Sequence, residues 1–464
     1  MNRTALKRLC WFHAWLLWGA LFVLLALKPD TLSLRWHFWL ALVTWLLCLW
    51  HCTRHSQGGL FSPSVAYVLL LGVFHFGLVG TVLIGIKPAF PHAWVSSAHL
   101  PTALALCGMA FSFLASGNAL ATLRHRGESV TDNPSALWSS RDFANRRLFV
   151  AGLGLGLLGL CLLAVGAGRL GVFSVSYAES WRLRELRDPR LFGVGLTFAL
   201  MGMVVSAVGA DKRRILYVAL LFALAFTPLV AYGFRGHFVV YFAALLLVWH
   251  RKDPRTAMRV AVVFALLIVV FAPTVMLTRS HQATSAAELI RQVPSHSLFA
   301  EMGGTMRILV ETIGTIEQRD TSYWCGHSYA FAIGRVIPNV SWVWRPHPSR
   351  SEEAPSGWIT SRIAPWTFRR GGGVGFSGIA EPYLNFGVPG VIFFFVLLGY
   401  ALMQCDYVPR QNVYLTAVVM CAFGGLLWTT RNDFASFVRP AVWGACFVYL
   451  TRALPARNRI RREP

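Results

Sequence analysis

The sequence lacks the short motifs that mark many enzymes of known chemistry. It has no H-E-x-x-H zinc motif, no phosphate-binding Walker loop, no Asp-x-Asp pair and no G-x-S-x-G turn in a useful setting. Its nine cysteines include no C-x-x-C, and all except Cys325 lie in or beside apolar runs. A disulfide framework and a zinc site are therefore not indicated, and we expect no cofactor and no metal.

Acidic residues and lysines are scarce as well. The chain carries 20 Asp plus Glu against 43 Lys plus Arg, for a net charge of +23, and only five of the basic residues are lysine. The basic residues are spread among loops between apolar runs, which argues against a nucleic acid as partner. Arginine binds phosphate or carboxylate through a planar fork. An anionic substrate with phosphates is one explanation of the arginine excess, and a codon bias is the other.

Long apolar runs dominate what is present. Of 464 residues 55% are hydrophobic, and the mean hydropathy is +0.53. The runs are about twenty residues long, the length of a membrane-spanning helix. They lie at 9–27, 36–52, 65–86, 99–122, 148–168, 191–210, 214–231, 236–250, 258–278, 388–404, 412–429 and 434–451. The alternation typical of an outer-membrane barrel is absent. The sequence predicts an all-α polytopic membrane protein with about twelve transmembrane helices.

The loop charges predict the orientation. The first run is too long for a signal peptide and no A-x-A cleavage site follows it, so we expect a retained helix. With the N-terminus in the cytoplasm, the short inner loops and the basic tail obey the positive-inside rule, and both termini are cytoplasmic. The predicted divisions are a transmembrane bundle of about nine helices (1–278), a large periplasmic loop (279–387), and C-terminal helices with a cytoplasmic tail (388–464).

The large loop has two kinds of sequence. Its first third has apolar stripes at helical spacing, and we expect short amphipathic helices there, on the membrane surface or over the bundle. The stripes are Leu289, Ile290 and Val293, then Met302, Met306, Leu309, Val310 and Ile313. The following residues 322–373 are rich in Trp, Pro and Arg, and we expect them to be irregular. Their aromatic side chains suit either the interfacial belt or stacking on sugar rings.

Glu381 is the strongest candidate for chemistry. A carboxylate at the edge of a membrane helix is costly and is by default a functional hypothesis, although stabilisation by the helix dipole is the alternative. Asn385 lies four residues later, and the glycine-rich segment 371–375 before it suits a hinge or a close backbone approach. His327 has the best intrinsic pKa for a general base in the loop, but a lone histidine is more often structural.

Two arginines lie in very short outer turns. Arg235 lies in G-F-R-G and Arg431 in T-T-R-N-D-F. Arg235 needs a counter-ion or a phosphate, or it extends to the lipid headgroups. An internal ion pair of Arg431 with Asp433, or of Arg439 with Glu381, is the plain interpretation of the other turn.

Together these motifs resemble the O-antigen polymerase (Wzy-type oligosaccharide repeat unit polymerase) family. F-S-G-I-A-E-P-Y-L-N-F-G-V-P-G at 376–390 is similar to the family strip S-x-I-A-E-x-Y-x-N-F-G-x-x-G, and Tyr323, Gly326, Tyr329 and Ile337-Pro338 look like its Y-x-x-G…Y…I-P pattern. The resemblance covers about residues 170–440. Pro382 departs from the strip, and we expect it to stiffen the start of the helix and to shift Glu381.

The resemblance implies a GT-C-like, metal-independent enzyme of the bacterial inner membrane. It would transfer a growing glycan from undecaprenyl diphosphate to a lipid-linked repeat unit, with a chain-length-regulating co-polymerase and membrane lipids as partners and no nucleic acid. We expect Glu381, His327 and Asn385 to be catalytic. The expected diphosphate-binding residues are Arg235, Arg307, Arg335, Arg345 and Arg431, and the expected sugar-binding residues are Tyr323, Tyr329 and Tyr383. An O-antigen ligase, or a transporter of an anionic lipid-linked sugar, is the alternative.

Overall fold

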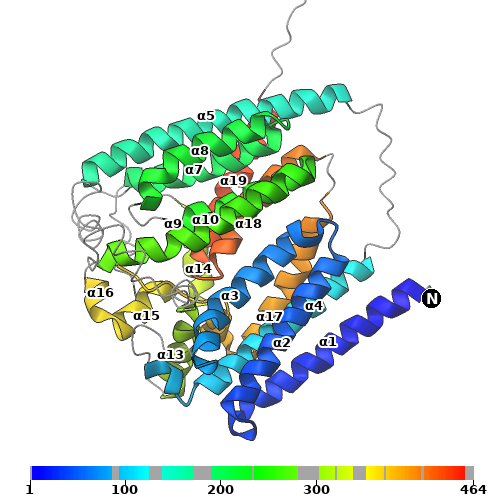
Figure 1. Ribbon diagram of the computed structural model, residues 1–464, viewed down its shortest axis with the longest axis vertical. Coiled ribbons are helices and arrows are strands. Elements are labelled where there is room, and N and C mark those ends of the chain that lie inside the picture. The colour runs from blue at the N-terminus through cyan, green and yellow to red at the C-terminus, as the bar shows by residue number, and fades with distance from the viewer. Residues whose placement is uncertain are drawn as a thin grey trace, which may run out of the picture.

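The computed structural model describes most of the chain, in separate ranges. These are 3–85, 93–124, 138–171, 190–231, 235–280, 303–318, 321–337, 352–369, 372–408 and 412–454. Only the backbone is described at 3–5, 138–143, 170, 190, 230–231, 235 and 268–280. Within these ranges every regular element is a helix (Figure 1).

The first 280 residues form long helices with short connections. They are α1 (Arg3–Leu27), α2 (Leu34–His55), α3 (Pro63–Leu83), α4 (Leu100–Arg124), α5 (Trp138–Leu170), α7 (Arg190–Gly209), α8 (Arg214–Ala231), α9 (Arg235–Lys252) and α10 (Pro254–Ser280). Three 3-10 helices lie between them: η1 (Pro29–Thr31), η2 (Gly59–Phe61) and η3 (Ala93–Ser96).

The remainder consists of four short helices followed by three long ones. The short ones are α13 (Thr305–Glu317), α14 (His327–Gly334), α15 (Pro355–Ile363) and α16 (Pro365–Arg369). The long ones are α17 (Ala380–Asp406), α18 (Val413–Trp428) and α19 (Ala435–Ala453). In Figure 1 the short helices gather at one end of the long ones.

Each of the twelve predicted spans overlaps one long helix. In the described part of the chain, six helices are long and apolar enough to cross a membrane by length and composition, and α8 and α18 contain shorter apolar segments. The six lie in α1, α3, α4, α5, α7 and α17. The prediction of an all-helical polytopic membrane protein is confirmed.

Local chemistry explains where several helices begin. Ser62 precedes Pro63, and its side-chain oxygen accepts a hydrogen bond from the N–H of Val65 at 3.1 Å. Proline at the first helical position and serine before it are the favoured start of a helix. Asn412 makes the equivalent bond to the N–H of Leu415 at 3.0 Å, at the start of α18. Ser62 and Asn412 therefore define where these two helices begin, which the composition of the apolar runs alone does not.

Glycines bring α5 and α7 into backbone contact. A Cβ atom added at Gly202 would lie 2.2 Å from the nitrogen of Gly156, and one at Gly195 would lie 2.4 Å from the nitrogen of Leu163. One added at Gly209 would lie 2.3 Å from the nitrogen of Phe149. In lipid, helices associate by close packing rather than by the hydrophobic effect, and small residues permit it. The seven-residue spacing of the α7 glycines therefore aligns this helix along α5.

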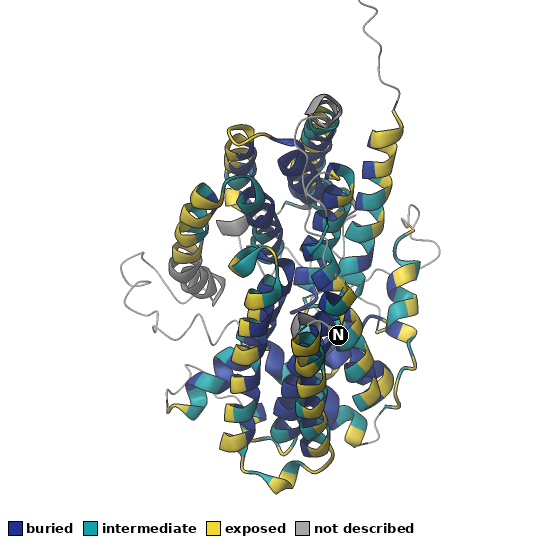
Figure 2. Ribbon diagram, turned by 90° about the vertical axis from the view of Figure 1, so that its right-hand side faces the viewer, coloured by how far each residue is buried: buried dark blue, intermediate teal, exposed yellow. Residues whose placement is uncertain are grey.

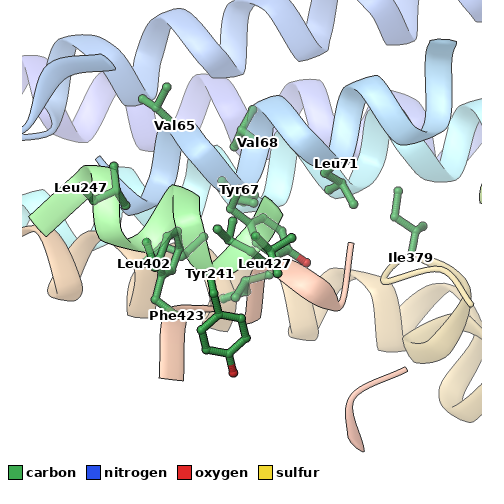
Figure 3. Close-up of a cluster of buried hydrophobic side chains, with 14 of the residues drawn as sticks. Val65, Tyr67, Val68, Leu71, Tyr241, Leu247, Ile379, Leu402, Phe423 and Leu427 are labelled. Carbon is green, nitrogen blue, oxygen red and sulfur yellow. The ribbon is translucent and has the colours of Figure 1, made fainter. Parts of the chain in front are cut away.

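Two groups of helices make up the body of the molecule. α1 and α2 pack on α4, which also packs along α17, while α5, α7, α9, α18 and α19 form the second group (Figure 1). α3 contacts both α17 and α18, so it lies where the groups meet. Buried residues concentrate between the helices (Figure 2). Figure 3 shows part of this core, where side chains of α3 such as Tyr67 and Leu71 meet those of α9, α17 and α18.

The large loop is only partly as predicted. α13 is amphipathic and buries Met306, Leu309, Val310 and Ile313 against the bundle, which confirms the second predicted stripe. The first stripe and Met302 lie outside the described residues. The prediction that residues 322–373 are irregular is wrong for α14, α15 and α16. The proline content contributed to that prediction, but Pro355 and Pro365 are each the first residue of a helix, where no N–H is required.

Candidate functional site

The glycine-rich segment reaches α17 by running against the turn that contains Arg431. Phe376 donates its backbone N–H to the carbonyl oxygen of Arg431 at 3.0 Å. Gly375 has φ +80°, and a Cβ atom there would lie 2.7 Å from that same oxygen. Only glycine permits both the left-handed backbone and this approach. The expected close approach thus occurs, and here it is to the chain itself.

Ser377 organises the first turn of α17. Its hydroxyl oxygen accepts hydrogen bonds from the N–H groups of Ile379 and Ala380, both at 3.2 Å, and its carbonyl accepts one from the N–H of Glu381 at 3.0 Å. The first N–H groups of a helix have no partner within it. Ser377 supplies partners and so fixes the backbone that carries Glu381. Pro382 falls in this same first turn, where its missing N–H is harmless.

A buried histidine of α3 holds Ser377. His75 is fully buried, its Nε2 lies 2.8 Å from the Ser377 hydroxyl, and its Nδ1 lies 2.7 Å from the carbonyl oxygen of Leu71. A carbonyl oxygen only accepts, so Nδ1 carries a proton; in the neutral ring Nε2 then accepts from the Ser377 hydroxyl. Residues 302 apart in sequence are joined here.

Both oxygen atoms of the Glu381 carboxylate are engaged. The side chain is only 3% exposed. Oε1 accepts from the hydroxyl of Ser328 at 2.7 Å, and Oε2 accepts from the backbone N–H of Phe434 at 2.6 Å. Ser328 belongs to α14, and Phe434 directly precedes α19. Hydrogen bonds to a charged acceptor are the stronger ones, so two separate segments hold the carboxylate of α17 in one orientation.

Asn385 links the same helices one turn further along α17. Its Nδ2 donates to the Ser328 hydroxyl oxygen at 2.7 Å and to the Glu381 carbonyl at 2.8 Å. Its Oδ1 accepts from the N–H groups of Gly326 at 3.0 Å and Ser328 at 3.4 Å. Residues four apart on a helix share a face, and that face here receives the start of α14. Ser328 therefore connects Glu381 and Asn385.

Two glycines of the motifs have backbones that other residues rarely adopt. Gly326 has φ +90° and Gly387 has φ +64°. Gly387 interrupts α17 between a short first segment and the long apolar helix. A Cβ atom at Gly387 would lie 3.0 Å from the Tyr323 ring, and one at Gly326 would lie 3.2 Å from the Phe386 ring. The glycines of Y-x-x-G and N-F-G thus allow the loop and α17 to meet.

The two strips that carried the resemblance therefore form one site. A family model described as O-antigen polysaccharide polymerase Wzy matches residues 13–457. The chain belongs to this family. The match is wider than the predicted 170–440, since it includes the N-terminal apolar helices as well. Membership supports a polysaccharide polymerase role, an enzyme that acts on lipid-linked oligosaccharide repeat units. No curated protein and no solved structure matches the chain.

His327, a predicted base of this Wzy-family chain, lies beside the Glu381 network. Its side chain is exposed at the start of α14, and its ring contacts the Trp324 ring edge-on at a centroid distance of 5.6 Å. The adjacent residue, Ser328, points inward and bonds Glu381. Of the three predicted catalytic residues, the structure brings Glu381 and Asn385 together. A catalytic role for His327 stays a prediction.

The predicted sugar-binding tyrosines differ in exposure. Tyr323 is 44% exposed, and its ring meets the Tyr383 ring edge-on at 6.1 Å between centroids. Tyr383 is buried at 6%. The Tyr329 ring packs against Phe434 at 5.2 Å and against two further phenylalanines. Of the three rings, Tyr323 has the most surface available for a sugar.

The predicted arginines are dispersed. Arg431 lies in the turn that precedes Phe434, with its guanidinium over the Phe74 ring at 5.7 Å. Arg307 of α13 donates to the carbonyl of Ile363 at 3.4 Å. Arg335 follows α14, and its guanidinium lies over the Phe331 ring at 5.7 Å. The side chain of Arg235 and all of Arg345 lie outside the described residues. Among the described candidate arginines, Arg431 is the one that lies in the same turn as Phe434, the residue whose backbone N–H donates to Glu381.

Sequence reasoning missed Ser328 and the Phe434 N–H, and it named Asp433 and Arg439 only as members of ion pairs. Ser328 was overlooked beside His327, and Phe434 contributes only a backbone N–H, which no side-chain motif reveals. Asp433 is buried and accepts from the Ser356 hydroxyl at 2.6 Å, so α15 is tied to the turn that holds Glu381. Arg439 donates to the carbonyl of Arg335 at 3.0 Å and so holds the end of α14.

Proposed function

We propose that this Wzy-family protein transfers a growing glycan from undecaprenyl diphosphate to an incoming lipid-linked repeat unit. The reaction would occur on the periplasmic face of the bacterial inner membrane, with about twelve spans in a GT-C-like arrangement and both termini in the cytoplasm. Family membership and the coincidence of each predicted span with a helix support this proposal. A chain-length-regulating co-polymerase belongs to the same proposal.

The observation that carries the proposal is the Glu381 carboxylate, buried and oriented by Ser328 and the N–H of Phe434. A sugar hydroxyl needs a base in order to attack, and a positioned carboxylate is a suitable one. Glu381 is therefore the proposed proton acceptor.

The proposed step is an in-line displacement. The acceptor hydroxyl oxygen forms a bond to the anomeric carbon of the donor glycan, while the bond from that carbon to the diphosphate oxygen breaks. Glu381 takes the hydroxyl proton, and undecaprenyl diphosphate leaves with the electron pair. Arg431, in the turn before Phe434, would stabilise the charge that develops on the diphosphate. In this scheme the positive charge comes from arginine and not from a metal.

The test is complementation of cells that lack the gene, with the glycan banding pattern on a gel as readout. Glu381→Gln keeps the shape of the side chain and removes the negative charge, so we expect single repeat units in place of the ladder. Glu317→Gln is the matched control, since Glu317 is 47% exposed and pairs with His99 at the end of α13. A full ladder from Glu381→Gln would remove Glu381 from the mechanism. Polymer that accumulates on its carrier in the deletion strain would instead indicate a ligase.

A further inference from the structure

Asp433 is a second buried carboxylate beside Glu381, and the proposed step gives it no role. Its side chain is 4% exposed, and its Oδ2 accepts from the hydroxyl of Ser356 at 2.6 Å. Aspartate is seldom fully buried without a partner, and a hydrogen bond to a carboxylate is a strong one. Ser356 of α15 therefore holds the Asp433 side chain in place.

The peptide unit between Asp433 and Phe434 carries one of the two donors to Glu381. Its N–H donates to Glu381 Oε2 at 2.6 Å, and its carbonyl oxygen accepts from the N–H of Ser436 at 3.1 Å. A peptide unit is planar, so the direction of the N–H follows from the orientation of the whole unit. The Asp433 side chain is attached directly to this unit. Its bond to Ser356 therefore limits how far the unit can turn, and the N–H stays aimed at the carboxylate.

The same helix also holds the segment that leads into α17. Thr360 lies four residues after Ser356, so the two side chains share a face of α15. The Thr360 Oγ1 accepts from the N–H of Val374 at 3.2 Å. Val374 precedes Phe376, which donates to the turn that contains Arg431. α15 thus contacts both the segment before α17 and the turn before α19, and Glu381 is held where these two helices begin.

We propose that Asp433 is a positioning residue for the transfer reaction, and that α15 acts on Glu381 through the hydrogen bond from Ser356 to Asp433. This inference rests on the proposed function. Asp433 takes no proton in this scheme; it fixes the N–H that orients the base. A helix of the large loop, outside the predicted spans, thereby determines how accurately Glu381 is aimed.

The experiment measures kcat, KM and Tm of purified variants in detergent, with lipid-linked repeat unit extracted from the deletion strain as substrate. We expect Asp433→Ala and Ser356→Ala each to lower kcat about tenfold to a hundredfold with an unchanged KM, because a small misplacement of a catalytic group has this effect. Asp433→Asn keeps an oxygen that can accept from Ser356, so it should retain most of kcat. The double variant Ser356→Ala/Asp433→Ala should lose no more than Asp433→Ala alone, since the two residues act through one bond.

The chain offers a matched control at the other end of α17. Asp406 is also 4% exposed, and its Oδ2 accepts from the hydroxyl of Ser64 at 3.1 Å. It is the last residue of α17, whereas Glu381 is the second. Asp406→Ala therefore removes an equivalent buried group and should lower the Tm as Asp433→Ala does, but it should leave kcat unchanged.

The comparison separates positioning from general stability. Equal losses of kcat in Asp433→Ala and Asp406→Ala would overturn the inference, since activity would then follow stability alone. An Asp433→Asn variant as slow as Asp433→Ala would overturn it as well, because the charge and not the bond would then matter. If Asp433→Ala does not fold, Ser356→Ala decides the test, and a wild-type kcat in that variant overturns the inference. A wild-type kcat in Glu381→Gln would instead overturn the proposed role of Glu381, so the two failures are distinguishable.

Discussion

Ser328→Ala should disable the candidate site without touching a titratable residue. The substitution removes the hydroxyl that donates to Glu381 at 2.7 Å and accepts from Asn385 at 2.7 Å. A hydrogen bond to a charged group contributes about 1.5–3 kcal/mol to stability, and the loss of a neutral one about 1 kcal/mol. Asn385 keeps its bond to the Glu381 carbonyl. We therefore expect a total loss of about 2–3 kcal/mol, and a carboxylate free to turn about its remaining bond.

The assay has two parts, thermal unfolding in detergent and the glycan ladder in complemented cells. Ser328→Thr keeps a hydroxyl and should preserve more of both quantities than Ser328→Ala does. Ser361→Ala is the matched control, because Ser361 is a half-buried serine of α15 that donates to the carbonyl of Trp358 at 2.9 Å, within its own helix. Equal stability and equal ladders for Ser328→Ala and the wild type would refute the reasoning that Ser328 holds Glu381.

Three further substitutions test separate parts of the structure. Gly326→Ala places a side chain at φ +90°, which costs about 1–2 kcal/mol, so we expect a lower Tm and a weaker ladder. Gly373→Ala should change neither, because the nearest atom to a Cβ at Gly373 would be 3.9 Å away. His75→Phe removes the partner of Ser377 and should weaken the ladder more than His75→Gln, which can still hydrogen-bond; equal ladders would contradict this role. Gly202→Val overpacks the contact between α5 and α7, which should cost about 1–3 kcal/mol of stability and lower the Tm. Gly193 has open space around it, so Gly193→Ala should leave the Tm unchanged.

The long helices were predictable because an apolar run of membrane length has few other structures available. The pairing of Glu381 with Asn385 was also predictable, since their spacing of four places them on one face of a helix. The role of Ser328 was not, because its contact with Glu381 joins residues 53 apart and depends on how α14 packs. The choice of a general base by its intrinsic pKa favoured His327, although the next residue in the chain, Ser328, is the one that contacts the Glu381 carboxylate.

The start of α17 shows the same limit. Ser377 was visible in the family strip, but its partner His75 lies in an apolar helix far away in sequence, and no local pattern pairs the two. Pro355 and Pro365 show a different limit, since the same residue begins some helices and breaks others, and the outcome depends on position. Backbone donors such as the Phe434 N–H have no signature in the sequence at all.

The order in which the Glu381 hydrogen bonds can form has a consequence for biogenesis. One donor, Ser328, precedes Glu381 in the chain, and the other, Phe434, follows it directly before the last described helix. Because a protein is synthesised from its N-terminus, the second bond can form only after the ribosome has passed residue 434. A chain that ends before this residue keeps most of its membrane helices but lacks one of the two hydrogen bonds that orient the Glu381 carboxylate. Because Glu381 is the proposed proton acceptor, truncated products that insert into the membrane should form no glycan ladder.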